Sequence, residues 1–86
     1  MRHATPATLD EIEMLLVGVR AMPGLVERKR GIFYRKGSGF LHFHEDAAGL
    51  FADVRLQSGG DYERMRVSTI AERKRFMSAL RKAVTR

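Results

Sequence analysis

The sequence predicts an α+β domain in which two helices flank four antiparallel strands, in the order α-β-β-β-β-α. Hydrophobic residues recur with the helical period near both ends of the chain and with a period of two between them. A threonine followed three residues later by glutamate, the capping-box pattern of a helix start, occurs at each helical stretch. We therefore expect a four-stranded sheet with both helices packed on one face and the other face in water.

The first helix is predicted over residues 8–22. Thr8 and Glu11 form its capping box, and early acidic residues suit the positive end of the helix dipole. Pro23 and Gly24 are expected to end it. The second helix is predicted over residues 70–84, after a capping box of Thr69 and Glu72. Its apolar side chains share one arc: Ile70, Phe76, Met77, Leu80, Ala83 and Val84.

Four strands are predicted between the helices, at residues 31–36, 40–44, 50–56 and 62–67. Glycine-rich turns separate the first from the second and the third from the fourth. The pairing of the two central strands stays open between two registers. One pairs His42 with Asp53 and His44 with Phe51, and a slip of two residues pairs Phe43 with Leu50 instead. Both registers put the two histidines on the face away from the helices.

The chain has 86 residues, 44% of them hydrophobic, which is enough for one core and too little for two. We therefore predict a single domain over residues 1–86, with residues 1–7 as a flexible N-terminal segment. The sequence has no cysteine, which excludes disulfides and thiolate metal sites. No apolar run approaches the roughly 18 residues of a membrane span, and we expect a cytoplasmic protein.

The histidines of "GFLHFHED" (39–46) are the strongest candidates for chemistry. His42 and His44 would share one face of a strand, as a metal site needs, and Asp53 could add a ligand. We expect no metal there, because that face holds no third histidine and no enclosing shell in the predicted sheet. We also predict no catalytic residue and no cofactor, and we favour a non-enzymatic binding domain.

Self-association is the function that we expect first from the sequence. Phe40 and Phe51, with Phe33 or Tyr34, would form an apolar patch on the open face of the sheet. Such a patch is most simply covered by a second copy of the chain, so we predict a homodimer.

Nucleic-acid binding is the alternative, because the net charge of +6 is unevenly distributed. Residues 28–36 hold five basic side chains and no acidic one. A groove between the first strand and the second helix would present the candidate phosphate-binding residues Arg28, Lys29, Arg30, Lys74, Arg81 and Lys82. The same charges could instead protect a sheet edge and complement a helix dipole.

Two stretches carry a resemblance to known families: "AMPGLVERKRGIFYRKGSGFLHFHED" (21–46) and "GLFADVRL" (49–56). They resemble small uncharacterised bacterial domains of the luciferase-domain-like kind, in which Pro-Gly after the first helix leads into a sheet with a histidine-containing strand. The α-β4-α order is similar to that of MmcQ/YjbR-like proteins, whose fold has been compared with DNA-binding double-wing domains. The resemblance implies an α+β fold and, by analogy, nucleic-acid binding.

Overall fold

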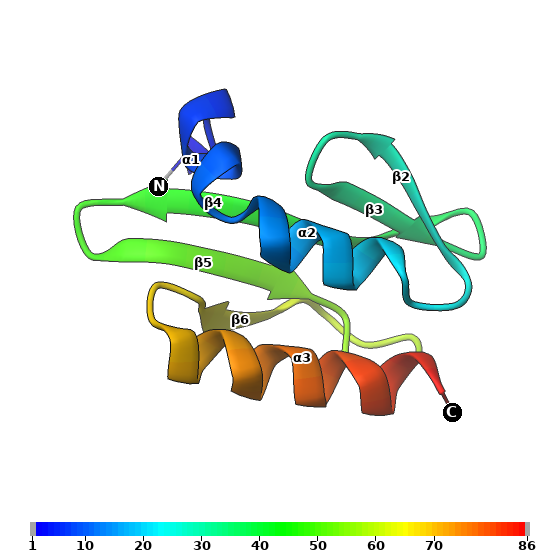
Figure 1. The fold of residues 1–86 in the computed structure, drawn as a ribbon. Helices are drawn as coiled ribbons and strands as arrows, with labels where there is room; N and C mark the ends of the chain where they lie inside the picture. The colour runs from blue at the N-terminus through cyan, green and yellow to red at the C-terminus, as the bar shows by residue number, and fades with distance from the viewer. Residues whose placement is uncertain (1, 86) are drawn as a thin grey trace.

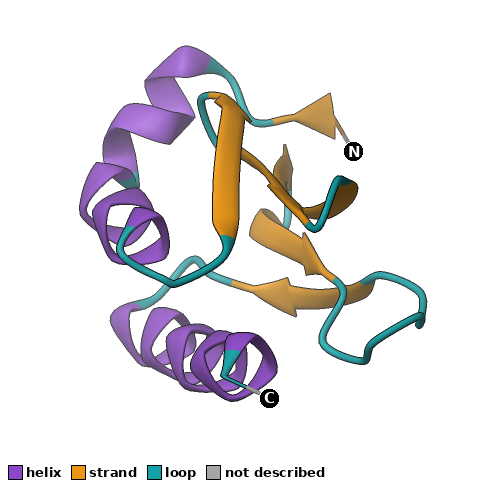
Figure 2. Cartoon of the chain, turned by 90° about the vertical axis from the view of Figure 1, so that its right-hand side faces the viewer, coloured by secondary structure: helices purple, strands orange, loops and turns teal. Residues whose placement is uncertain are grey.

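The computed structural model describes residues 2–85 as one antiparallel sheet with helices on one of its faces (Figures 1 and 2). The α+β class is confirmed, but the sheet has more strands than we predicted. The elements in chain order are β1 (Arg2–His3), α1 (Pro6–Glu11), α2 (Glu13–Arg20), β2 (Leu25–Lys29), β3 (Ile32–Arg35), β4 (Ser38–Asp46), β5 (Gly49–Val54), β6 (Glu63–Arg66) and α3 (Ile70–Val84).

The sheet runs in the order β2-β3-β4-β5-β6, and β1 pairs with β4 outside this path. The prediction of four strands is therefore wrong, because β1 and β2 were missed. In β2, Leu25 and Val26 are followed by three charged residues, so this edge strand lacks the alternation that marks a half-buried strand. With two residues, β1 is too short to show any period.

The predicted first helix is two helical segments, and it does not begin at Thr8. Thr5 is the N-cap of α1, because its Oγ1 accepts a hydrogen bond of 3.3 Å from the backbone N–H of Thr8. Pro6 follows at the first helical position, which suits its fixed φ angle. The chain then kinks at Ile12, whose φ of −107° and ψ of 19° interrupt the helix while its side chain enters the core.

The second predicted helix is confirmed with the bounds Ile70–Val84. Both halves of its capping box are present: the Thr69 side chain accepts from the backbone N–H of Glu72, and the Glu72 carboxylate accepts from that of Thr69. Phe76 and Leu80 of this helix are fully buried against the sheet. The N-cap read from the sequence therefore places α3 correctly. The predicted apolar arc is wrong at Ile70, which is 71% exposed in the first turn of the helix.

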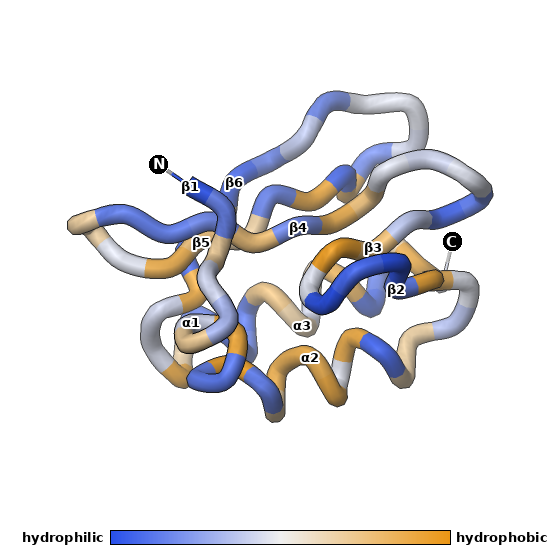
Figure 3. Tube along the Cα trace, turned by 90° about the horizontal axis from the view of Figure 1, so that it is seen from above, coloured by the Kyte–Doolittle hydropathy of each residue, from blue (hydrophilic) through white to orange (hydrophobic). Residues whose placement is uncertain are grey.

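The central strand pair adopts the first of the two predicted registers, with His42 opposite Asp53 and His44 opposite Phe51. Leu41 and Phe43 consequently point to the helices and are almost completely buried. Hydrophobic and hydrophilic residues alternate along β4 (Figure 3). The helix-covered face holds the core, and the opposite face of β4 and β5 carries the histidines.

The N-terminal residues lie beside the end of β4 (Figure 1). The flexibility that we predicted for residues 1–7 stays a prediction, and Met1 lies outside the described residues. Among residues 2–85, no helix is long and apolar enough to cross a membrane.

Candidate metal centre

Three histidines meet on the open face of the sheet, and we call them the histidine cluster: His3, His42 and His44. His42 and His44 lie two residues apart on β4, so both rings leave the same face. His3 is opposite His44 in the pairing of β1 with β4. The ring centroids are 4.6 Å apart for His3 and His44, 4.7 Å for His42 and His44, and 5.9 Å for His3 and His42.

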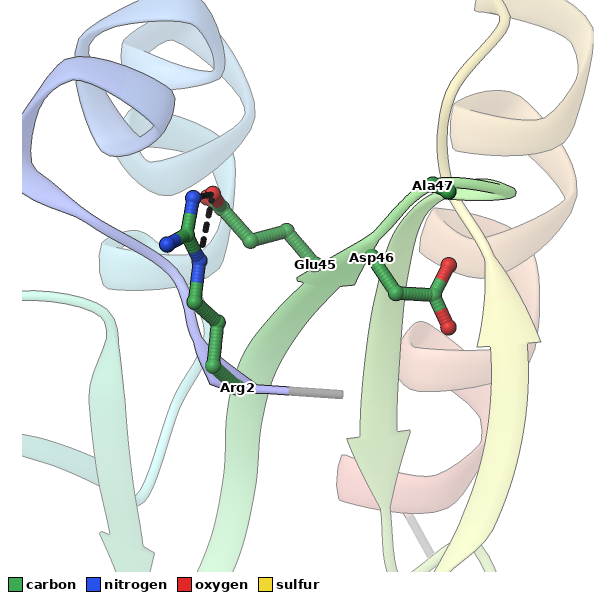
Figure 4. Close-up of a pocket in the computed structure, with 4 residues that line it drawn as sticks. All are labelled: Arg2, Glu45, Asp46 and Ala47. Carbon is green, nitrogen blue, oxygen red and sulfur yellow. Dashed lines mark hydrogen bonds and ion pairs between the residues drawn. The ribbon is translucent and has the colours of Figure 1, made fainter.

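The histidine cluster depends on the anchoring of β1, and Glu45 provides most of that anchor. Its Oε1 accepts hydrogen bonds of 2.8 and 3.2 Å from the guanidinium of Arg2 (Figure 4). Its other oxygen, Oε2, accepts from the backbone N–H of Thr5. The N–H of Ala4 also donates to the carbonyl of Phe43. The Arg2 side chain is 73% exposed, so its ion pair with Glu45 alone stabilises the strand little. Together with the backbone hydrogen bonds of Ala4 and Thr5, this ion pair holds β1, and with it His3, against β4.

Asp53 holds the ring of His44 in one orientation. Its Oδ2 lies 2.8 Å from His44 Nδ1, and the Arg64 guanidinium donates to Oδ1 at 2.8 Å and to Oδ2 at 3.0 Å. The Arg64 hydrogen bonds, and secondarily the bond to His44, lower the pKa of Asp53 despite its burial. An ionised Asp53 can only accept, so the proton of neutral His44 is on Nδ1 and its Nε2 lone pair is free for a metal.

His42 is held neutral by its surroundings. Burial, followed by repulsion from His44, lowers its pKa below the ordinary value, and the Tyr62 ring packs edge-on at 4.8 Å. Its Nδ1 is buried and has no hydrogen-bond partner among the described residues. A buried ring nitrogen without a partner is costly in free energy, and a neutral imidazole is the form that binds metals.

The spacing of the histidine cluster fits a transition metal ion. One ligand nitrogen from each ring lies within 4.8 Å of the other two. Zinc binds histidine nitrogens at about 2.0–2.1 Å in a tetrahedron, which separates them by roughly 3.3 Å. The three nitrogens would therefore have to move closer together on binding, and His3 is the exposed member of the cluster. A zinc-bound histidine typically donates its other ring N–H to a carboxylate, and His44 has such a partner in Asp53.

Two of the three histidines were found from the sequence, and the third was missed. Our premise that this face lacks a third histidine is wrong, since His3 lies on it. Asp53, expected as a possible metal ligand, is 6% exposed, and its carboxylate is already hydrogen-bonded to His44 and Arg64. No sequence signal pointed to His3, because a two-residue strand has no period and lies about 40 residues from its partner.

The apolar patch predicted for self-association is incomplete. Phe40 is 4% exposed, so its assignment to an interaction surface is wrong. Its ring lies under the guanidinium of Arg35, at 5.7 Å, and forms part of the core. Phe33 is buried also, and Phe51 is half-buried between His44 and Arg66 on the neighbouring strands. Dimerisation through this face stays a prediction.

The basic residues named from the sequence are exposed but divided between two places. Arg28 and Lys29 are on the edge strand β2 and Arg30 follows it, whereas Lys74, Arg81 and Lys82 are on α3. The groove expected between these segments is absent among the described residues, because α2 packs against both β2 and α3. Arg30 is also ion-paired with Asp10 and Glu13. Phosphate binding by these six residues stays a prediction.

Comparison with models of protein families, with curated proteins and with solved structures found no match. The resemblance to luciferase-domain-like and MmcQ/YjbR-like proteins therefore stays a prediction.

Proposed function

We propose that this protein binds a divalent transition metal ion through His3, His42 and His44. The observation that carries the proposal is the pairing of His3 with His44, which brings a third imidazole to the His-x-His strand. Three histidines with a carboxylate behind one of them match the ligand set of zinc sites that keep an open position. Copper and nickel also accept imidazole ligands, so the donor set favours this group of metals over magnesium or calcium.

Each residue around the histidine cluster has a separate part in the proposed site. Asp53 keeps the His44 proton on Nδ1, and the pairing of Asp53 with Arg64 keeps that carboxylate ionised. Tyr62 packs on His42 and limits the access of water from that side. A bound zinc ion would offer its fourth position to water or to an anionic ligand and would lower the pKa of such a water.

Metal titration followed by NMR of the histidine rings tests the proposal. We expect saturable shifts of all three rings with one equivalent of Zn²⁺ or Ni²⁺, reversed by a chelator. His3→Gln should weaken binding by at least about tenfold, since one of three ligands is lost. The matched control Asp61→Asn removes an exposed carboxylate elsewhere and should bind as the parent protein does. Non-saturable shifts, or shifts that omit His3, would refute the three-histidine site.

Self-association through the sheet and nucleic-acid binding remain lesser proposals, and added salt separates them. Four or five phosphate contacts would lose roughly a hundredfold in affinity between about 50 and 200 mM salt. Apolar self-association should hold or strengthen over that range. Sedimentation of the metal-free protein, alone and with a DNA duplex or a single-stranded DNA, measures self-association and nucleic-acid binding. A protein that stays monomeric and binds neither nucleic acid would rule out the two proposals.

A further inference from the structure

A hollow of about 220 Å³ opens where the turn between β3 and β4 meets the loop after β5. We call it the basic pocket, and its polar lining consists of Arg35, Lys36, Ser38, Arg55 and Ser58. Among the described residues, no acidic side chain lines it. Three positive charges thus converge with two hydroxyl groups and no counter-charge of the protein's own.

Among residues 2–85, Arg55 stands out as a partly buried cation whose side chain lacks protein partners. Its Nε is buried without a hydrogen-bond partner, and it forms no ion pair with any of residues 2–85. The guanidinium is held in place all the same, because it stacks on the Tyr62 ring at 4.5 Å. The backbone N–H of Arg55 also donates to the carbonyl of Phe40 at 3.0 Å. An immobilised guanidinium with unused donors is suited to an anionic ligand.

The opposite wall of the basic pocket is equally fixed. Arg35 donates to the carbonyls of Ala83 and Val84 at the end of α3, and its guanidinium lies over Phe40. The turn that follows has Lys36 at a φ of +52°, a conformation that non-glycine residues rarely adopt. Holding a lysine there costs free energy, and the conformation sets the direction in which its side chain leaves the turn.

We propose that the basic pocket binds the phosphate group of a small molecule, as free phosphate or as a phosphomonoester. Two guanidinium groups offer paired donors that match phosphate oxygens, while Lys36 adds a point charge and the serines add hydroxyl donors. The volume of about 220 Å³ is several times the roughly 30 Å³ occupied by a water molecule, so it accommodates a phosphate group and a small substituent. This site shares no residue with the histidine cluster and does not depend on a bound metal.

Amide NMR titrations with inorganic phosphate and with glycerol phosphate test this proposal. A chelator is kept present throughout, so that phosphate held by a metal at the histidine cluster is excluded. We expect saturable shifts at Gly39 and Gly59, which line the basic pocket. Arg55→Gln should weaken binding by about tenfold or more, because a charge-assisted hydrogen bond is lost.

Two further variants make the result decisive. Lys36→Gln changes an exposed turn residue, so it should weaken binding without threatening the fold, even if Arg55→Gln does not fold. Lys74→Gln removes an exposed charge from α3 and should leave binding unchanged. The proposal is overturned by non-saturable shifts, by equal losses in Lys36→Gln and Lys74→Gln, or by binding of a single-stranded oligonucleotide without binding of either small ligand.

Discussion

Replacing Asp53 by asparagine should weaken both the fold and the proposed metal site. The Asp53 carboxylate accepts two hydrogen bonds from Arg64 and one from His44, and its side chain is 8% exposed. Asparagine has one acceptor oxygen, and its NH₂ group must then face another donor, either the guanidinium or the imidazole N–H.

The magnitude follows from the hydrogen bonds that are lost. A hydrogen bond to a charged group is worth about 1.5–3 kcal/mol, and the half-exposed Arg64 recovers part of this from water. We therefore expect the free energy of unfolding to fall by about 1–2 kcal/mol, which lowers Tm by roughly 4–8 °C per kcal/mol in a domain of this size. Loss of the carboxylate behind His44 should reduce zinc affinity by about 10–100-fold.

Thermal unfolding and zinc titration of the two variants Asp53→Asn and Arg64→Gln provide the assay. Arg64→Gln leaves the carboxylate on His44, so it should retain most of the zinc affinity. Nitrogen chemical shifts of His44 report its tautomer, which a merely structural role of Asp53 would not change. Equal zinc affinity in Asp53→Asn and the parent, or an unchanged His44 tautomer, would refute the assignment of Asp53 as a positioning residue.

Three other outcomes follow from the same structure. Glu45→Ala should release β1 and reduce zinc affinity as far as His3→Gln does, whereas Asp46→Ala, whose side chain points away from the Arg2 pair, should not (Figure 4). The free energy of unfolding should fall as the pH drops below about 6.5, because the pKa of His42 is lowered in the folded state and the unfolded chain then binds more protons. Urea unfolding at neutral and mildly acidic pH measures this dependence, and a free energy of unfolding that does not change with pH would contradict it. Gly49→Ala should lower the free energy of unfolding by at least about 1 kcal/mol more than Gly24→Ala does in the same urea assay. Both glycines have a positive φ, but a Cβ at Gly49 would lie 2.5 Å from Ser68 Oγ, whereas a Cβ at Gly24 would meet open space. Equal costs would mean that the contact relaxes freely.

The sequence by itself determined the parts of the fold that repeat with a period. The capping box and apolar arc of α3 are local signals, and they located a helix of 15 residues, although Ile70 of the arc is exposed. Alternation along β4 and β5 likewise fixed which face His42 and His44 occupy, because a shift of one residue would bury the histidines and expose Leu41 and Phe43.

The tertiary structure alone decided what lies beside these elements. Phe40 has the parity of the open face, yet Arg35 and the core cover it, because the sheet is irregular where β3 meets β4. His3 reaches the histidine cluster through a two-residue strand anchored by Glu45, and Arg55 reaches the basic pocket through its stacking on Tyr62. These contacts join residues far apart in the chain, and no period or spacing encodes them. The candidate sites depend on such long-range pairings, whereas the helices and strands that support them depend on local patterns.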